Sequence, residues 1–341
     1  MEMYFFKHDE WERLYNCSLY RVDDIPLEKR QHIALGVFFI LVSIIFITLY
    51  TPCIIAVRNH LKHSCYKFLF FLGIVDILSI PMNGILTGYM TIVGAMFCNY
   101  PKLLYFSGSY GYFCWITETT MAIFLALNRC CEILSPNIAR YLFHGQLPWL
   151  WMIVLMMYGL YFAIFTKPVM FNGIYMAWFN NPHVGYNDDP GGITYGNHLH
   201  FVHNIIVCCS LTGLYVLFCI LYLLKSRTLR RHSSNAGPVF VKNTLQRSVF
   251  IQVLLISSIN TIGSALYIYM QFVNVTPWLT IAAQFSWIII NGMPGILFLV
   301  VNKTIRTECI QMIFKISKAA PTSENQIYAL RPISGGRPNS Q

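Results

Sequence analysis

Seven long runs of hydrophobic residues follow one another along the chain, separated by short polar segments. An α-helix needs about 20 mostly apolar residues to cross the hydrocarbon core of a bilayer, and each run is close to this length or exceeds it. The pattern predicts an all-α membrane protein, a bundle of seven transmembrane helices surrounded by membrane lipid. The predicted spans are residues 33–57, 68–94, 103–134, 148–166, 199–224, 249–273 and 277–301. Pro81 and Pro294 lie inside the second and seventh spans, where we expect each to kink its helix.

Basic residues between the runs indicate the orientation, because short loops rich in Lys and Arg stay on the cytoplasmic side. With the N-terminus outside, 17 of the 24 Lys and Arg residues lie in the inner loops and tail, and 7 lie outside. The third inner loop, which contains Lys225, Arg227, Arg230 and Arg231, decides for this orientation. We predict an extracellular segment over 1–31, the helix bundle over 32–301, a short amphipathic juxtamembrane helix over 302–318 and a disordered cytoplasmic tail over 319–341.

The composition agrees with a membrane protein and excludes other classes. Hydrophobic residues make up 56% of the chain and charged residues only 11%, against roughly 25% charged residues in soluble domains. The net charge of +10 does not indicate nucleic acid as a partner, because the basic residues are spread over short loops instead of one folded face. Residues 1–31 lack the apolar stretch of a cleavable signal peptide, so we expect the first span to act as the targeting signal.

Two acidic residues lie within the predicted spans, Asp76 in the second and Glu118 in the third. Ionisable groups are costly inside a membrane and are functional candidates by default. We hypothesise that the two acids form an intramembrane site that shares a proton or binds a cation such as sodium. Packing between helices is the alternative interpretation.

The third span ends in the charged sequence Asn128-Arg129-Cys130-Cys131-Glu132. Arg129 follows Glu118 by eleven residues, about three helical turns, so the two lie on nearly one face with roughly 16 Å between them. Gly108, Gly111 and Trp115 extend this face towards the outer side, and we therefore expect the third helix to be central in the bundle. For the two glycines, close helix packing and a ligand cavity are equal alternatives.

The positions of the cysteines leave one candidate disulfide. Only Cys17 and Cys98 face the oxidising outer side, and a bridge between them would tie the N-terminal segment to the top of the third helix. Two separate thiols are the alternative. Asn16-Cys17-Ser18 is a glycosylation acceptor sequence, with a chance occurrence as its alternative. No Cys and His spacing is typical of a zinc site, and we expect neither a metal nor a cofactor.

Several short motifs occur in a characteristic order. They are Leu14-Tyr15-Asn16-Cys17-Ser18, Tyr50-Thr51-Pro52-Cys53, Cys98-Asn99-Tyr100-Pro101, Leu127-Asn128-Arg129-Cys130-Cys131-Glu132, Gly292-Met293-Pro294 and Asn302-Lys303-Thr304-Ile305-Arg306. With seven spans and the acid in the second, the chain resembles a rhodopsin-like G-protein-coupled receptor. More closely, it resembles the nematode serpentine chemoreceptors of class T, over nearly its whole length to about residue 315.

The resemblance implies a receptor in the plasma membrane of sensory neurons. An outside ligand would shift the bundle between two states, and a heterotrimeric G protein would bind the inner face. Arg129 would anchor the switch, together with Asn128, Glu132, Asn291 and Pro294. Asn128 replaces the acid that usually precedes this Arg. Either another partner holds Arg129 inactive, with Glu132 one turn on as the candidate, or Arg129 is not locked at all. Asp76 matches the acid of the family's sodium site.

Ligand binding is expected in the outer half of the bundle, where an aromatic pocket with few charges suits small, mostly apolar odorants. The predicted ligand-binding residues are Tyr112, Trp115, Thr119, Tyr267, Gln284 and Trp287. A peptide bound by the loop 167–198 is the alternative ligand.

Three other functions compete with a receptor. A transporter or channel of seven spans is the alternative function, but the chain shows no inverted repeat. A retinal-based light receptor needs a Lys in the seventh span, and residues 277–301 contain none. The spans also lack the residue patterns of a catalytic site, so we expect no enzyme.

Overall fold

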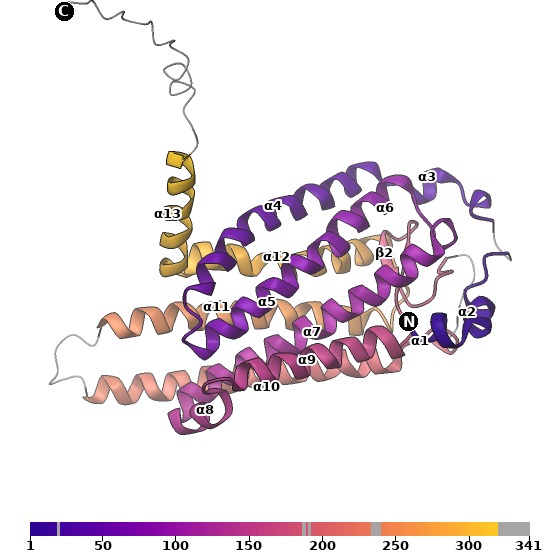
Figure 1. Ribbon diagram of the computed structural model, residues 1–341. Coiled ribbons are helices and arrows are strands. Elements are labelled where there is room, and N and C mark those ends of the chain that lie inside the picture. The colour runs from indigo at the N-terminus through magenta and orange to yellow at the C-terminus, as the bar shows by residue number, and fades with distance from the viewer. Residues whose placement is uncertain (19–20, 186–188, 190–191, 233–239, 320–341) are drawn as a thin grey trace, which may run out of the picture.

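The computed structural model describes residues 1–18, 21–185, 189, 192–232 and 240–319, with the backbone alone for 222, 225–232, 240–250 and 313–319. Seven long helical segments lie side by side in one bundle (Figure 1), so the predicted fold class is confirmed. They are α4 (Ile33–Arg58), α5 (Ser64–Ile80) continued by η2 (Pro81–Leu86) and α6 (Thr87–Val93), α7 (Pro101–Leu134), α9 (Leu147–Phe165), α10 (His198–His232), α11 (Phe240–Tyr269) and α12 (Pro277–Val301).

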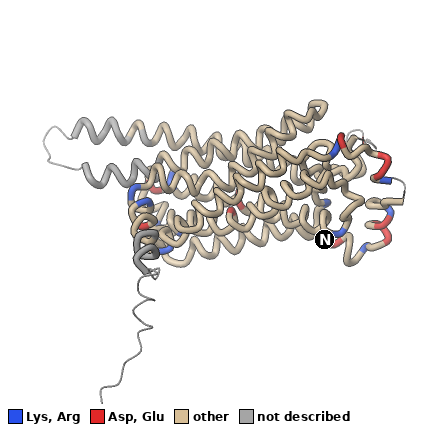
Figure 2. Tube along the Cα trace, turned by 90° about the horizontal axis from the view of Figure 1, so that it is seen from above, with Lys and Arg blue, Asp and Glu red and all other residues tan. Residues whose placement is uncertain are grey.

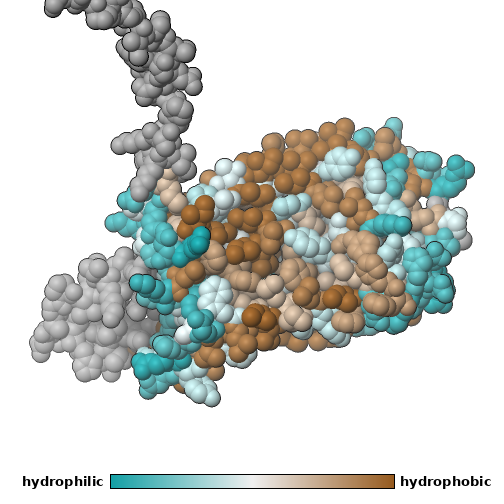
Figure 3. All heavy atoms as spheres, viewed as in Figure 1, coloured by the Kyte–Doolittle hydropathy of each residue, from teal (hydrophilic) through white to brown (hydrophobic). Residues whose placement is uncertain are grey.

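The face of the bundle seen in Figure 3 is apolar in the middle and polar at its two ends. Within the described residues, six of the seven segments are long and apolar enough to cross a membrane, and the more polar α7 completes the set. The polar residues of α7 contact protein instead of lipid, since Ser109, Thr117, Glu118 and Asn128 are fully buried. Lys, Arg, Asp and Glu gather at the two ends of the bundle (Figure 2), and hydrophobic side chains cover the middle (Figure 3).

Pro81 changes the second span from an α-helix into a π-helix over η2. Proline has no N–H to close the regular hydrogen bond of an α-helix, so the chain makes a wider turn before α6 resumes. The Tyr110 hydroxyl of α7 donates to the Leu78 carbonyl at 2.8 Å, which gives this carbonyl a partner within the membrane, where backbone polar groups must be satisfied by protein. The disturbance expected at Pro81 thus takes the form of a wide turn.

The N-terminal segment folds into the short helices α1 (Glu2–Phe6), α2 (His8–Leu14), η1 (Val22–Asp24) and α3 (Leu27–Arg30). Isolated helices of this length are not stable in water, so packing must stabilise them. Tyr105 of α7 contacts the rings of Trp11 and Tyr15, with ring centroids 5.9 Å and 5.3 Å apart. The N-terminal segment is therefore docked on the outer end of the third helix.

A β-hairpin occupies the outer loop between α9 and α10, a loop to which the sequence assigned no structure. β1 (Met170–Asn172) pairs antiparallel with β2 (Ala177–Phe179), with Met170 opposite Phe179. The Asn172 side chain accepts a hydrogen bond from the Ile174 N–H at 2.9 Å, which orders the connecting turn. Both strands are largely buried, so the hairpin forms part of the protein interior at the outer end.

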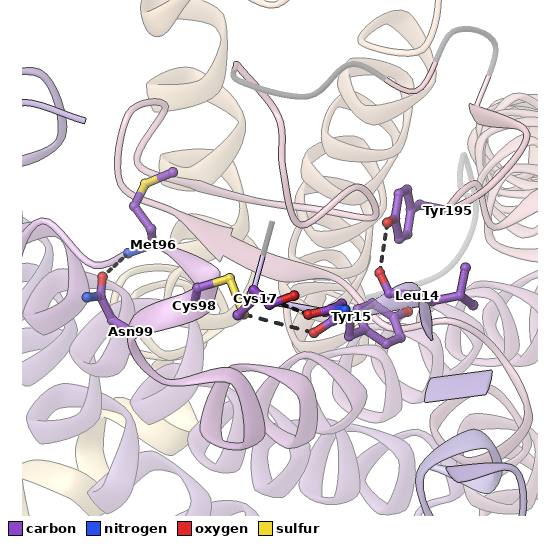
Figure 4. The surroundings of a disulfide bond; sticks show 9 residues. Leu14, Tyr15, Cys17, Met96, Cys98, Asn99 and Tyr195 are labelled. Carbon is purple, nitrogen blue, oxygen red and sulfur yellow. Dashed lines mark hydrogen bonds between the residues drawn. A yellow bond between two sulfur atoms is a disulfide. The ribbon is translucent and has the colours of Figure 1, made fainter. Parts of the chain in front are cut away.

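A disulfide joins Cys17 to Cys98, the pair identified from the sequence (Figure 4). Cys98 belongs to η3 (Phe97–Asn99), immediately before α7. Nearby, the Tyr195 hydroxyl donates to the Leu14 carbonyl at 2.8 Å (Figure 4). The N-terminal segment is therefore attached both to the start of the third helix and to the loop that contains the hairpin.

At the inner end, α8 (Pro136–Phe143) forms the second inner loop, and α13 (Lys303–Ala319) leaves the bundle at a steep angle (Figure 1). Glu308 fixes α13 to the first inner loop, where it accepts from Asn59 Nδ2 at 3.0 Å and lies 2.6 Å from His60 Nε2. α13 coincides with the predicted juxtamembrane helix. The tail was predicted over 319–341, and residues 320–341 of it lie outside the described residues.

Candidate functional site

A cavity lies in the outer half of the bundle, below the hairpin. Its lining residues come from four helices and the hairpin region: Tyr112, Trp115, Val169, Trp178, His200, Tyr267 and Trp287. The volume is about 30 Å³, enough for about two water molecules. A larger ligand can enter only if side chains or the hairpin move.

Four of the six residues predicted for ligand binding line this cavity, namely Tyr112, Trp115, Tyr267 and Trp287. Thr119 and Gln284 lie outside the lining, and both have other partners. The Thr119 hydroxyl is 2.9 Å from His203 Nε2 of α10, and Gln284 Nε2 donates to the Asn83 carbonyl at 2.6 Å. These two polar side chains therefore connect helices. The spacing of residues in the sequence cannot distinguish this role from contact with a ligand.

The sequence missed three lining residues, Val169, Trp178 and His200. Two lie in the hairpin region, whose strands of three residues are too short to give a clear alternation in the sequence. His200 stands in the first turn of α10, four residues before Asn204. This spacing places both side chains on one face of the helix. The sequence therefore contained a pattern from which His200 could have been identified.

A chain of hydrogen bonds forms the α10 side of the cavity. The Trp115 indole N–H donates to Asn204 Oδ1 at 3.0 Å, and Asn204 Nδ2 lies 3.2 Å from His200 Nε2. The other ring nitrogen of His200 is 3.4 Å from the Tyr112 hydroxyl, which also accepts from Asn180 Nδ2 at 2.7 Å. This polar wall connects α7, α10 and the loop that follows the hairpin.

The hairpin rests directly on α7 at Gly108. A Cβ atom at this position would lie 1.6 Å from the Val169 carbonyl oxygen, so only glycine permits this approach of the two backbones. Beside it, the Trp178 indole N–H donates to the Thr87 hydroxyl at 2.8 Å. The sequence left two alternatives for Gly108, close helix packing and a ligand cavity. This contact agrees with close packing, but the packing partner is the hairpin region instead of another helix.

Asp76 accepts two hydrogen bonds in the middle of the membrane. The Tyr50 hydroxyl donates to one oxygen at 2.8 Å, and Asn291 Nδ2 donates to the other at 3.1 Å. Asn291 Oδ1 in turn accepts from Asn83 Nδ2 at 2.5 Å and from the Ser79 hydroxyl at 3.1 Å. The acid thus joins the first, second and seventh spans.

Glu118 is fully buried and accepts from Asn260 Nδ2 of α11 at 3.0 Å. Within the part of the chain that the structure describes, its second oxygen, Oε2, and the amide oxygen of Asn260 have no hydrogen-bond partner. The structure records no hydrogen bond between Glu118 and Asp76 among the described residues. The two acids are therefore anchored separately, Asp76 to the first and seventh spans and Glu118 to the sixth.

Arg129 is held by its own helix at the inner end of α7. Its guanidinium donates to Asn128 Oδ1 at 2.7 Å and to Glu132 Oε1 at 2.5 Å. Ser64 of α5 donates to the same Glu132 oxygen at 3.2 Å and accepts from Asn128 Nδ2 at 3.1 Å. The acid absent from position 128 is therefore replaced by one from the following turn, the partner suggested by the sequence.

The structure also gives the positions of the remaining predicted site residues, Asn16 and Pro294. Asn16 is exposed, and its side chain accepts from the Ser18 N–H at 2.7 Å. Pro294 lies inside α12. Among the described residues, no group of three or more His, Cys, Asp or Glu side chains is placed to hold a metal ion.

Comparisons with known proteins agree on one family. Residues 1–321 match the model of the family described as serpentine type 7TM GPCR chemoreceptor Srt. Serpentine receptor class T-55 of Caenorhabditis elegans is 27% identical over 331 residues, which cover 93% of this chain and 84% of that relative. The crystal structure of squid rhodopsin superposes with a TM-score of 0.63 at 14% identity, over 92% of this chain and 94% of that one. This last likeness concerns the fold.

The family match covers nearly the whole chain, the relative carries the class T name, and the architecture is that of rhodopsin. The chain belongs to the Srt family of serpentine seven-transmembrane chemoreceptors.

Proposed function

We propose that this protein is a chemosensory G-protein-coupled receptor that responds to a small molecule bound in the outer cavity. The single observation that carries the proposal is the course of α7. This helix lines the cavity with Trp115, holds Glu118 against α11 and ends at Arg129 on the inner face. We also propose the plasma membrane of sensory neurons as its location, because its family and relative are described as chemoreceptors or serpentine receptors.

Ligand binding would act by changing the packing of three aromatic side chains. Trp115 contacts Tyr267 of α11 and Trp287 of α12, with ring centroids 5.4 Å and 6.2 Å away. One helical turn or two below these rings, Asn260 and Asn291 hold the two buried acids. A ligand that binds one arrangement of these helices more tightly shifts the population towards it, and the inner face changes with it.

The switch proposal assigns the contact with a heterotrimeric G protein to the inner end of α7. In the structure, Arg129 is occupied by Asn128 and Glu132, which fits an inactive arrangement. The Arg129–Glu132 pair is partly exposed, so its separation costs little, about 1 kcal/mol or less. A ligand that binds the released arrangement about fivefold more tightly than the closed one therefore offsets this cost.

Expression of Arg129→Ala with a promiscuous G-protein reporter and an odorant panel tests this function. We expect loss of every response at unchanged surface expression, because the side chain that contacts the G protein is missing. Glu132→Gln serves as the opposite variant, with basal signalling raised up to about fivefold when the ion pair is lost. Unchanged responses in Arg129→Ala would overturn the switch role.

We further propose that Glu118 and Asp76 act as an intramembrane proton or cation site. The free Glu118 Oε2 and the unpartnered Asn260 oxygen support this, since a bound proton or cation satisfies such buried oxygens. We expect Glu118→Gln to remove any dependence of signalling on sodium and pH. Sodium and pH responses identical to those of the wild type would count against the site.

Asn16 is proposed to carry an N-linked glycan, because its sequon is exposed on the outer side. Glycosidase treatment should increase the electrophoretic mobility of the wild type and leave Asn16→Gln unchanged. A wild type that does not shift would contradict the modification.

A further inference from the structure

Trp287, a residue of the cavity lining, has a polar group without a hydrogen-bond partner among the described residues. This group is the buried indole nitrogen Nε1, and the residue as a whole is only 5% exposed. A buried N–H group without an acceptor destabilises the protein, because its hydrogen bond to water is lost and not replaced. Something that binds in the cavity can recover this energy by offering an acceptor.

The other polar groups of the described lining already have partners. The indole N–H of Trp115 donates to Asn204, that of Trp178 donates to Thr87, and the Tyr267 hydroxyl donates to the Ala283 carbonyl at 3.4 Å. The Tyr112 hydroxyl accepts from Asn180 and lies 3.4 Å from His200 Nδ1 on the α10 side of the cavity. Among the described lining residues, Trp287 therefore carries the one indole N–H that has no acceptor.

His200 is neutral in this arrangement, as its neighbours require. An indole N–H can only donate, so Trp115 must face the oxygen of the Asn204 amide, and the amide nitrogen then faces His200 Nε2. Because an amide nitrogen donates, His200 Nε2 must be the ring nitrogen that carries no proton. His200 consequently offers a ligand no positive charge.

The described lining also contains no Asp, Glu, Lys or Arg. An anionic ligand would leave water without a counter-charge in the cavity, and the desolvation of an unpaired anion is prohibitive. For a cation, the aromatic ring faces offset part of this cost, but no carboxylate of the described lining completes a pair. The aromatic lining binds apolar surface, so the cavity favours uncharged molecules and rejects carboxylates.

We propose that the cavity binds a small uncharged molecule with one carbonyl or ether oxygen, and that the Trp287 indole N–H donates to this oxygen. This inference rests on the proposed receptor function for its biological meaning, but the chemistry concerns binding alone. With a cavity of about 30 Å³, the molecule must displace part of the wall. Val169 and Trp178 belong to the hairpin region, which provides a wall that is not part of a transmembrane helix.

Four probes of similar shape test this proposal: acetophenone, ethylbenzene, protonated 1-phenylethylamine and benzoate. Binding is measured by titration calorimetry and thermal stabilisation on the purified full chain in lipid nanodiscs. We expect acetophenone to bind about tenfold more tightly than ethylbenzene, as one hydrogen bond allows. The protonated amine should bind more weakly than acetophenone, and benzoate should not bind. Absence of acetophenone binding, or equal binding of either ion, would overturn the proposal.

Trp287→Phe keeps an aromatic ring and removes only the N–H. This variant should bind acetophenone and ethylbenzene equally. Trp278→Phe, in the same helix but 82% exposed, is the matched control and should retain the tenfold preference. A preference that survives in Trp287→Phe contradicts the assigned donor. The binding measurement needs no G protein, so the two proposals can fail separately. If acetophenone binds but causes no signalling, the receptor function is contradicted and this inference is not. If only ions cause signalling, this inference is contradicted and the receptor function is not.

Discussion

Gly108→Ala is expected to displace the hairpin from α7 and to weaken ligand binding by about tenfold or more. The added Cβ would lie 1.6 Å from the Val169 carbonyl oxygen and 2.7 Å from its carbonyl carbon. Both atoms belong to the backbone, so no rotation of a side chain relieves the clash. Overpacking of this kind costs about 1–3 kcal/mol, and here the cost falls on the segment that closes the cavity.

Thermal unfolding and protease cleavage within residues 167–185 measure this effect on the purified protein. Gly213→Ala is the matched control, because no atom lies within 4 Å of a Cβ at Gly213 of α10. Alanine in place of a helical glycine should leave stability unchanged or raise it by up to about 1 kcal/mol. If the melting temperature and the protease cleavage rate of Gly108→Ala equal those of Gly213→Ala, the hairpin does not depend on this contact.

Asp76→Leu is expected to destabilise the bundle by about 2–6 kcal/mol. The substitution leaves the Tyr50 hydroxyl and Asn291 Nδ2 buried without their acceptor, and each unsatisfied donor costs about 1–3 kcal/mol. Asp76→Asn retains one amide oxygen and should lose less. The melting temperature of the purified variants gives the order wild type, Asp76→Asn and Asp76→Leu.

Tyr50→Phe separates this effect from a general loss of packing. It removes one hydrogen bond to Asp76 and keeps the ring, which is fully buried, so we expect a loss of about 1 kcal/mol. A melting temperature for Asp76→Leu equal to that of Tyr50→Phe would show that the carboxylate does not connect the three spans.

The seven spans were predictable because each depends on local composition. Twenty apolar residues in succession have few alternatives to a membrane helix, and α12 begins and ends at the predicted residues. The central position of α7 could also be predicted, because the spacing of Trp115, Glu118 and Arg129 along the sequence places them on one face of the helix. The boundaries of α10 and α11 on the inner side were less predictable, because both helices continue beyond the apolar residues.

The partners of the buried polar residues could not be predicted, because they come from distant parts of the chain. Tyr50 lies 26 residues before Asp76, and Asn260 lies 142 residues after Glu118. Thr119 and Gln284 have the right type and spacing for ligand contact, yet each points to another helix. The hairpin was missed because strands of three residues give too short an alternation to read.

The wide turn at Pro81–Leu86 has a consequence for how chain length is tolerated in this receptor. Each residue of an α-helix adds about 100° of rotation, and a π-helical turn holds more residues than an α-helical turn. Because the wide turn already holds an extra residue within about the same rotation, loss of one residue inside it would leave the helix beyond facing nearly the same way. Loss of one residue in the regular last turn of α5 would instead rotate everything beyond it by about that angle. Thr87 would then turn away from Trp178, its hydrogen-bond partner in the hairpin. A change in length of one residue, far from the inner face, would thus alter which side chains of the second span meet the outer cavity.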